Sequence, residues 1–171
     1  MSGRAGPSGR TLPARVQAPL LDRLIDDAPD QARDPPLSSA ESMMALRNAV
    51  RRDLEALLNA RRRWRSWPVQ MKQLATSPIG FGIEDFTAGA FNEPRRREAL
   101  RVEIEDTIRR FEPRFLSVHV VLIEVRDRLE ATLRLRIEAI MHAEPAPESI
   151  TFDTLVDPTT DDILVRTADT I

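Results

Sequence analysis

The chain has 171 residues, and its 42% hydrophobic content is sufficient for one domain with a substantial core. The 25 basic and 27 acidic residues give a net charge of −2, which argues against a uniformly basic nucleic-acid-binding domain. With no cysteine and two histidines, the sequence excludes disulfide frameworks, thiolate metal sites and a three-histidine zinc site.

Residues 1–19 are rich in Gly, Pro, Arg and Ala and have few large apolar side chains. Such a segment buries too little surface to offset the entropy lost on ordering, so we expect it to be disordered. It lacks the apolar run of a secretory signal, and no stretch of the chain approaches the ~20 apolar residues of a membrane-spanning helix. We expect a cytoplasmic protein without direct membrane insertion.

An apolar hexamer, residues 20–25, lies between this segment and a second Pro-rich stretch, residues 28–37. Two interpretations are open: a short helix packed on the chain's own core, or a linear motif that docks on a partner. We treat residues 20–37 as a docking motif with a Pro-rich linker, and residues 38–171 as a single domain. The candidate docking side chains are Leu20, Leu21, Asp22, Arg23 and Leu24.

A long helix is predicted from residue 38 onward. Ser38 suits the N-cap and Glu41 suits the third helical position of a capping box. Apolar residues then recur at helical spacing and form one stripe. The stripe consists of Met43, Leu46, Val50, Leu54, Leu57 and Leu58. We expect this helix to end between residues 59 and 63.

Residues 61–68, RRRWRSWP, follow directly. Arginines interleaved with tryptophans are typical of phosphate contacts combined with base stacking. The simpler interpretation is a solvated helix end whose tryptophan rings cover the edge of the core, and the low pI of about 5.8 favours it. A cationic patch for an acidic protein surface is a third interpretation.

The pattern of residues 77–86 indicates a loop, in which glycine permits a tight turn with positive φ rather than a phosphate cradle. A second helix begins at residue 92 or 93, with Pro94 in its first turn, and ends before Pro113. Its expected buried stripe is Leu100, Ile104, Ile108 and Phe111. Its expected water-facing residues are Arg95, Arg97, Glu98, Arg101 and Glu105.

From residue 116 the hydrophobic period changes to two, which predicts strands at 116–123, 133–141, 150–156 and 163–165. Turns are expected at 126–128, 144–147 and 157–161. The first strand is apolar on both faces toward its end, which favours a central or covered position. The predicted fold class is α+β: two main helices followed by a small antiparallel β-meander.

The search for chemistry yields few candidates. His119 lies inside a predicted strand and His142 at a strand end, so both are expected to be structural. At the junction of helix and strand, Pro113 fixes φ and holds Glu112 and Arg114 at a defined angle near a surface corner. Such a rigid pair of charges suits recognition of a partner, or it pairs locally and closes the corner.

The enzymatic alternative is a peptidoglycan hydrolase that uses Glu112 and Glu124 as its two carboxylates. The neighbouring Arg114 favours an ion pair over a general-acid role for Glu112.

Several segments, taken in chain order, resemble the TssE family of type VI secretion baseplate proteins. Residues 20–24 are similar to its LLDRL motif, 52–61 to its RDLExLLNTR helix, 77–86 to its SVLNYGLPDF loop and 109–114 to its IxRFEPRL signature. Residues 152–154 and the closing strand also fit. In the loop, Phe81 replaces the usual tyrosine and Glu84 the usual proline, while Ala60 replaces threonine in the helix.

This resemblance implies a structural subunit of a contractile injection machine, with no enzymatic activity and no cofactor. The same family includes phage baseplate wedge proteins labelled lysozyme-like, and its fold is similar to the strand-exchange domain of the tail sheath. Glu112, Pro113 and Arg114 would contact the helical wedge core of TssF and TssG. An edge of the meander would join the TssB/TssC sheath and start its assembly, and TssK is a further candidate partner. The resemblance adds Gly82 and Asp85 to the partner-binding residues.

Overall fold

The computed structural model describes residues 19–25, 29–30, 37–62, 66–85, 93–123, 133–143, 146–157, 160 and 162–168. The expectation of disorder over residues 1–18, the predicted hairpin tip at 126–128, Glu124 and the arginines and tryptophan at 63–65 lie outside the described residues.

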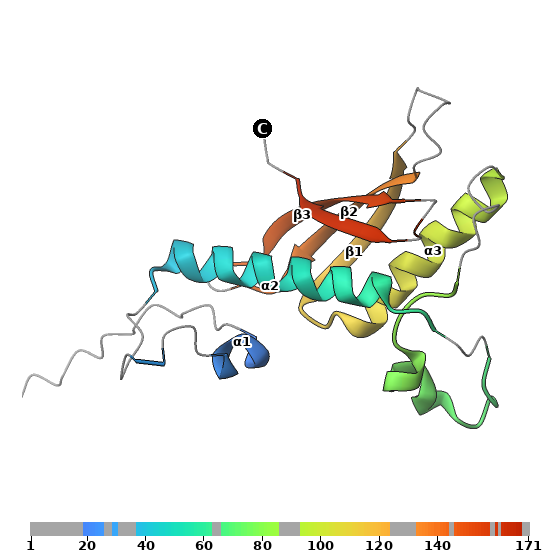
Figure 1. The fold of residues 1–171 in the computed structure, drawn as a ribbon, viewed down its shortest axis with the longest axis horizontal. Helices are drawn as coiled ribbons and strands as arrows, with labels where there is room; N and C mark the ends of the chain where they lie inside the picture. The colour runs from blue at the N-terminus through green and yellow to red at the C-terminus, as the bar shows by residue number, and fades with distance from the viewer. Residues whose placement is uncertain are drawn as a thin grey trace, which may run out of the picture.

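Helices precede strands, as predicted. The order is α1 (Leu20–Leu24), α2 (Ser39–Asn59), the 3₁₀ turns η1 (Lys72–Thr76) and η2 (Pro78–Gly80), α3 (Pro94–Phe111), then β1 (Phe115–Ile123), β2 (Leu133–Met141), β3 (Glu148–Val156) and β4 (Ile163–Thr167). The strands form an antiparallel sheet in the order β1-β2-β3-β4. Figure 1 shows α2 running across the sheet, and α3 lies near the C-terminal end of α2. The α+β prediction is confirmed.

The ends of both long helices follow from local sequence. The Ser38 hydroxyl accepts a bond from the Glu41 N–H (3.2 Å), and the Glu41 carboxylate accepts one from the Ser38 N–H (2.7 Å), which is the predicted capping box. Pro94 occupies the first turn of α3, where its missing N–H has no cost. The helix stops at Phe111 because Pro113 disfavours helical geometry in the residue before it.

The predicted apolar stripes form one core between the helices and the sheet. The strand β2 alternates strictly between buried and exposed residues, so one face of the sheet packs on the helices and the other faces solvent. The largest fully buried side chains include Phe152, Leu54, Leu58, Ile83, Ile104 and Ile137. Strand β3 begins two residues earlier than predicted, and β4 extends two residues further. No described helix combines the length and the apolar character needed to cross a membrane.

The position of β1 differs from the prediction. It lies at an edge of the sheet, not at its centre. Its apolar run arises because one face packs on α3, while Val121 on the other face keeps 37% of its surface exposed. The side chains of Arg101 and Glu105 were expected in water, but they are only 19% and 17% exposed because they fold against this strand.

Candidate functional site

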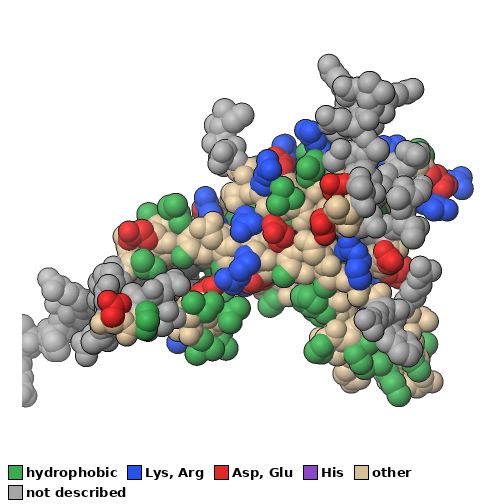
Figure 2. Space-filling model, viewed as in Figure 1, with side chains coloured by type: hydrophobic (Ala, Val, Ile, Leu, Met, Phe, Trp, Pro, Cys, Tyr) green, Lys and Arg blue, Asp and Glu red, His purple; other side chains and the backbone are tan. Residues whose placement is uncertain are grey.

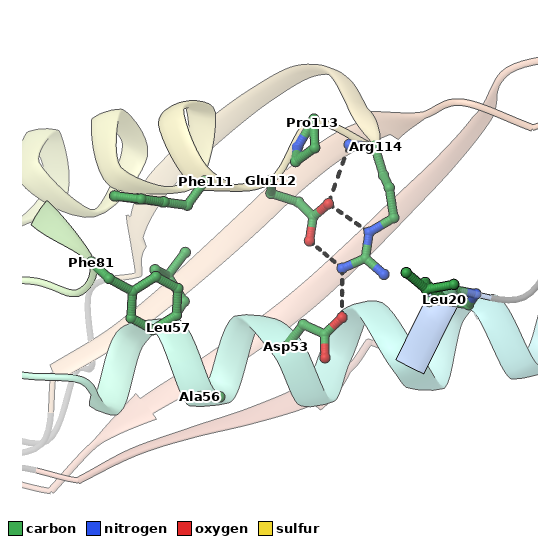
Figure 3. Close-up of a pocket in the computed structure, with 10 residues that line it drawn as sticks. Leu20, Asp53, Ala56, Leu57, Phe81, Phe111, Glu112, Pro113 and Arg114 are labelled. Carbon is green, nitrogen blue, oxygen red and sulfur yellow. Dashed lines mark hydrogen bonds and ion pairs between the residues drawn. The ribbon is translucent and has the colours of Figure 1, made fainter. Parts of the chain in front are cut away.

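The corner between α3 and β1 is closed by an ion pair between its own residues. Oε1 of Glu112 accepts hydrogen bonds from the backbone N–H (3.2 Å) and the Nε (2.6 Å) of Arg114, and Oε2 accepts from Nη2 (Figure 3). Pro113 lies at the apex and is exposed. Glu112 is 5% exposed, so its carboxylate is buried, whereas the sequence led us to expect it near the surface. The geometry matches the interpretation in which Glu112 and Arg114 pair locally and close the corner.

The same guanidinium connects the corner to α2. Nη2 of Arg114 donates to Oδ2 of Asp53 at 2.8 Å, which joins residues 61 positions apart. Burial by itself lowers the pKa of Arg114, but the bonds and charges of Glu112 and Asp53 outweigh it and raise the pKa above its ordinary value. The guanidinium therefore stays charged and fixes the distance between α2 and the corner.

A pocket of about 460 Å³ opens beside this ion pair. Phe81 and Phe111 form its apolar end and meet edge to face, with ring centroids 5.3 Å apart. Arg114 lies at its charged end, and its Nη1 points toward Leu20 and has no hydrogen-bond partner among the described residues (Figure 3). The full lining is Pro19, Leu20, Asp53, Ala56, Leu57, Phe81, Phe111, Glu112, Pro113 and Arg114.

Residues 20–24 do form a helix, but it is not packed on the core. Leu20, Leu21 and Leu24 are 69%, 56% and 73% exposed. The helix is attached to α2 through Asp22, which accepts bonds from Nη1 and Nη2 of Arg52 at 2.6 and 3.4 Å. Its leucines therefore form one apolar shoulder beside the pocket, and Leu20 lines the pocket itself.

Residues 66–85 form a second apolar shoulder on the other side. Figure 2 shows apolar side chains gathered on this segment and on α1, and both segments lie on the same side of α2. The exposed members of the second shoulder are Val69, Met71, Ile79 and Phe81. The pocket lies between the two shoulders, since Leu20 belongs to one and Phe81 to the other.

The predicted site residues are only partly brought together. Leu20, Glu112, Pro113 and Arg114 line the pocket, whereas Leu21, Asp22, Arg23, Leu24, Gly82 and Asp85 do not. Gly82 acts indirectly. It adopts a φ of +97° and has no Cβ to collide with the nearby Ala60 carbonyl, and the resulting turn places Phe81 in the pocket wall. The sequence did not identify three pocket residues of α2: Asp53, Ala56 and Leu57. A helical pattern does not reveal which distant segments will pack beside the helix.

One arginine of the RRRWRSWP segment has an internal role. Arg62 is 8% exposed, and its Nη2 donates to Glu84 at 3.1 Å and to Glu103 at 2.7 Å. Its guanidinium also lies over the ring of Trp67, 5.8 Å from the centroid. Arg62 thus ties the segment after α2 to the 77–86 loop and to α3, so it is neither a solvated helix end nor free to bind phosphate.

The side chains at this site form ion pairs with each other and show no arrangement for catalysis or metal binding among the described residues. Both oxygens of Glu112 are bonded to Arg114, which leaves neither free to reach a substrate. No group of three metal-ligating side chains occurs within the described ranges. His119 and His142 are both exposed, and Nδ1 of His119 lies 3.3 Å from Glu105.

Comparison with known families decides the identity. A family described as baseplate wedge protein gp25 matches residues 44–146. The chain belongs to this family. Baseplate wedge proteins of this kind are structural, and the resemblance found in the sequence is confirmed at that level. No curated protein matches the chain.

The match to the baseplate wedge family covers the site almost completely. It includes most of α2, the loop with Phe81, and α3, and it continues through the corner and β2. Of the residues that line the pocket, Pro19 and Leu20 fall outside it. The ion pair and the apolar end of the pocket are therefore both built by the wedge-family part of the chain.

Proposed function

We propose that this wedge protein is a TssE-type baseplate subunit of a type VI secretion system, acting in the cytoplasm as a structural part without catalytic activity. Membership of the baseplate wedge family supports the general role. The four ordered segments described above, which resemble TssE, support the narrower one. The bonding of both Glu112 oxygens to Arg114 favours a structural role over glycan hydrolysis.

The observation that carries the docking part of the proposal is the pocket between the two apolar shoulders. The pocket has an apolar end and a charged end. This combination suits an amphipathic helix, whose apolar side chains would enter the pocket. One such side chain would lie against Phe81 and Phe111. An oxygen of the partner would accept a hydrogen bond from Nη1 of Arg114, which has no partner among the described residues. The helical wedge core formed by TssF and TssG is the partner that we propose, and TssK is a further candidate.

We also propose that the meander contacts the first TssB/TssC sheath ring. Strand addition at a sheet edge requires free backbone groups. Side chains of α2 and α3 bond to the edges at Ile163, Val165 and Val120. Sheath strands would therefore have to displace these side chains or join the edges elsewhere.

The pocket is tested by filling it without disturbing the core. Ala56 is exposed on α2 and lines the pocket, so Ala56→Arg places a long side chain where the partner helix would lie. We expect at least about a tenfold loss of affinity for a purified TssF–TssG complex from the same gene cluster. A folded Arg114→Ala variant should also weaken binding, since it removes the Nη1 donor.

Met44→Arg is the matched control. Met44 is 63% exposed on the same helix, twelve residues away and hence about 18 Å along its axis. This variant should bind as the wild type does. Equal binding by folded Ala56→Arg would reject the pocket as the dock and leave family membership intact. A gene neighbourhood without sheath or TssF-like genes would argue against the type VI assignment itself.

A further inference from the structure

The four-stranded sheet is open, and side chains of the helices bond to the backbone at both of its edges. Edge strands present unpaired N–H and C=O groups that readily pair with another chain. In this sheet the edges are β1 and β4. The described helices send polar side chains to both edges, and those side chains bond directly to strand backbone.

At the β4 edge, α2 takes the place of a fifth strand. Asn59 bonds to both the N–H and the C=O of Ile163, each at 2.8 Å. One turn earlier, Glu55 accepts from the Val165 N–H and Arg51 donates to its C=O, both at 3.3 Å. Four helical residues rise about 6 Å and two strand residues about 6.7 Å, so a row of side chains at i and i+4 matches successive outward groups.

The β1 edge is more vulnerable. Its nine residues, FLSVHVVLI, include no proline and none of the residues Asp, Glu, Lys and Arg. Charges and prolines are the usual means by which edges avoid pairing, and apolar segments without them associate readily. By contrast, β4 has five residues and includes Arg166. The β1 edge thus needs protection from outside the strand.

That protection comes from two residues of α3. Oε2 of Glu105 accepts the Val120 N–H at 3.0 Å, and Nη1 of Arg101 donates to the Val120 C=O at 3.2 Å. The two side chains also bond to each other at 2.9 Å. Together they occupy both backbone groups of Val120, at the middle of the longer edge.

Alternation along the strand locates the groups that remain. Because the backbone groups of Val120 face outward, those of Val118 and Leu122 do so too, while His119 and Val121 face β2. Among the described residues, the outward groups of Val118 and Leu122 have no hydrogen-bond partner. One pair of side chains therefore separates two stretches of open edge.

We propose that the edge of β1 is a latent strand-pairing surface for a second copy of this chain, which Glu105 and Arg101 hold closed. Two copies of one edge strand are self-complementary in antiparallel orientation, as a two-fold dimer requires. Val121, with 37% of its surface exposed, would then be covered along the seam. This inference does not depend on the proposed baseplate role.

The test is the solution mass of the full chain as a function of concentration. The Arg101→Ala/Glu105→Ala double variant should shift from the monomer mass of 19.3 kDa toward twice that value, with self-association about tenfold tighter than in the wild type. Asp106→Ala is the matched control, because Asp106 is an exposed acid on the same helix whose carboxylate bonds to Arg109. It should behave as the wild type does.

Two further variants identify the surface. Glu105→Gln keeps an oxygen that accepts the Val120 N–H, so it should stay largely monomeric. Val121→Lys, added to the double variant, places a charge on the edge and should restore the monomer. A double variant with native circular dichroism that stays monomeric overturns the proposal, as does a dimer that Val121→Lys leaves unchanged. Should the double variant not fold, Arg101→Met/Glu105→Met takes its place, because it removes both the donor and the acceptor while keeping apolar stems. A folded variant of this kind that is monomeric at every concentration likewise overturns the proposal.

Discussion

The side-chain amide of Asn59 makes two hydrogen bonds with the backbone of Ile163, the pair that a neighbouring strand would otherwise make. The two residues are 104 positions apart. Asn59, at the end of α2, therefore caps the β4 edge at Ile163 and joins the first long helix to the last strand.

Removing this amide should destabilise the fold. We expect Asn59→Ala to lower the free energy of unfolding by about 1–3 kcal/mol, because both backbone groups of Ile163 lose their partner. Urea denaturation measures the change. Asn48→Ala is the control, since Asn48 is exposed on the same helix and should change stability by less than about 0.5 kcal/mol. Equal effects of the two substitutions would contradict the assigned role.

The buried Arg62 should matter more than an exposed arginine. Arg62→Met removes the ion pairs with Glu84 and Glu103, and we expect a loss of about 1–3 kcal/mol. The loss stays below that of a fully buried pair because both carboxylates reach water. Arg96→Met, which removes an exposed pair with Glu93, should change stability by less than about 0.5 kcal/mol. Thermal unfolding of both variants, followed by circular dichroism, makes the comparison.

Gly82 is required for two separate reasons. Its φ is +97°, and a Cβ at this position would lie 2.3 Å from the carbonyl oxygen of Ala60. Gly82→Ala should therefore cost about 2 kcal/mol or more. Because the crowding acts whatever φ the residue tolerates, Gly82→Asn should be destabilised as well. A Gly82→Asn variant with wild-type thermal stability would show that the turn can relax away from Ala60.

Acid should weaken the contact between α3 and β1. Burial by itself raises the pKa of Glu105, but the bonds from Val120 and Arg109 and the charges of Arg101 and Arg109 outweigh it and lower the pKa. A lowered pKa in the folded state gives stability that is present above the ordinary glutamate value of about 4.3 and is lost as pH falls through the folded value.

Urea midpoints measured from pH 3 to pH 7 test this. The urea midpoint of the wild type should decrease as the pH is lowered toward 3. The midpoint of Glu105→Gln should depend less on pH over the same range. Nδ1 of His119 also lies 3.3 Å from Glu105, so His119→Gln is measured alongside to separate the loss of this contact. Parallel pH profiles of wild type and Glu105→Gln would rule out the assigned role of Glu105.

The elements of the fold were predictable because their signals are local. The capping box of Ser38 and Glu41, the apolar stripes of α2 and α3, and the period of two in the strands lie within a few residues of each other. A positive φ was expected at the glycines of the 77–86 loop, and it is found at Gly82 but not at Gly80, which lies in η2. The corner was recognised, but its accessibility was not, because Asp53 is far away in the sequence.

The sequence by itself determined the helices, the strands, the α+β class and the family, since each depends on periodicity, capping or ordered short motifs. The tertiary structure decided that β1 is an edge, that Arg62 and Glu112 are buried and that Arg114 meets Asp53. The reason is physical: a polar or charged side chain is hydrophilic in any local sequence pattern. Packing between distant segments decides whether it faces water or bonds to protein groups.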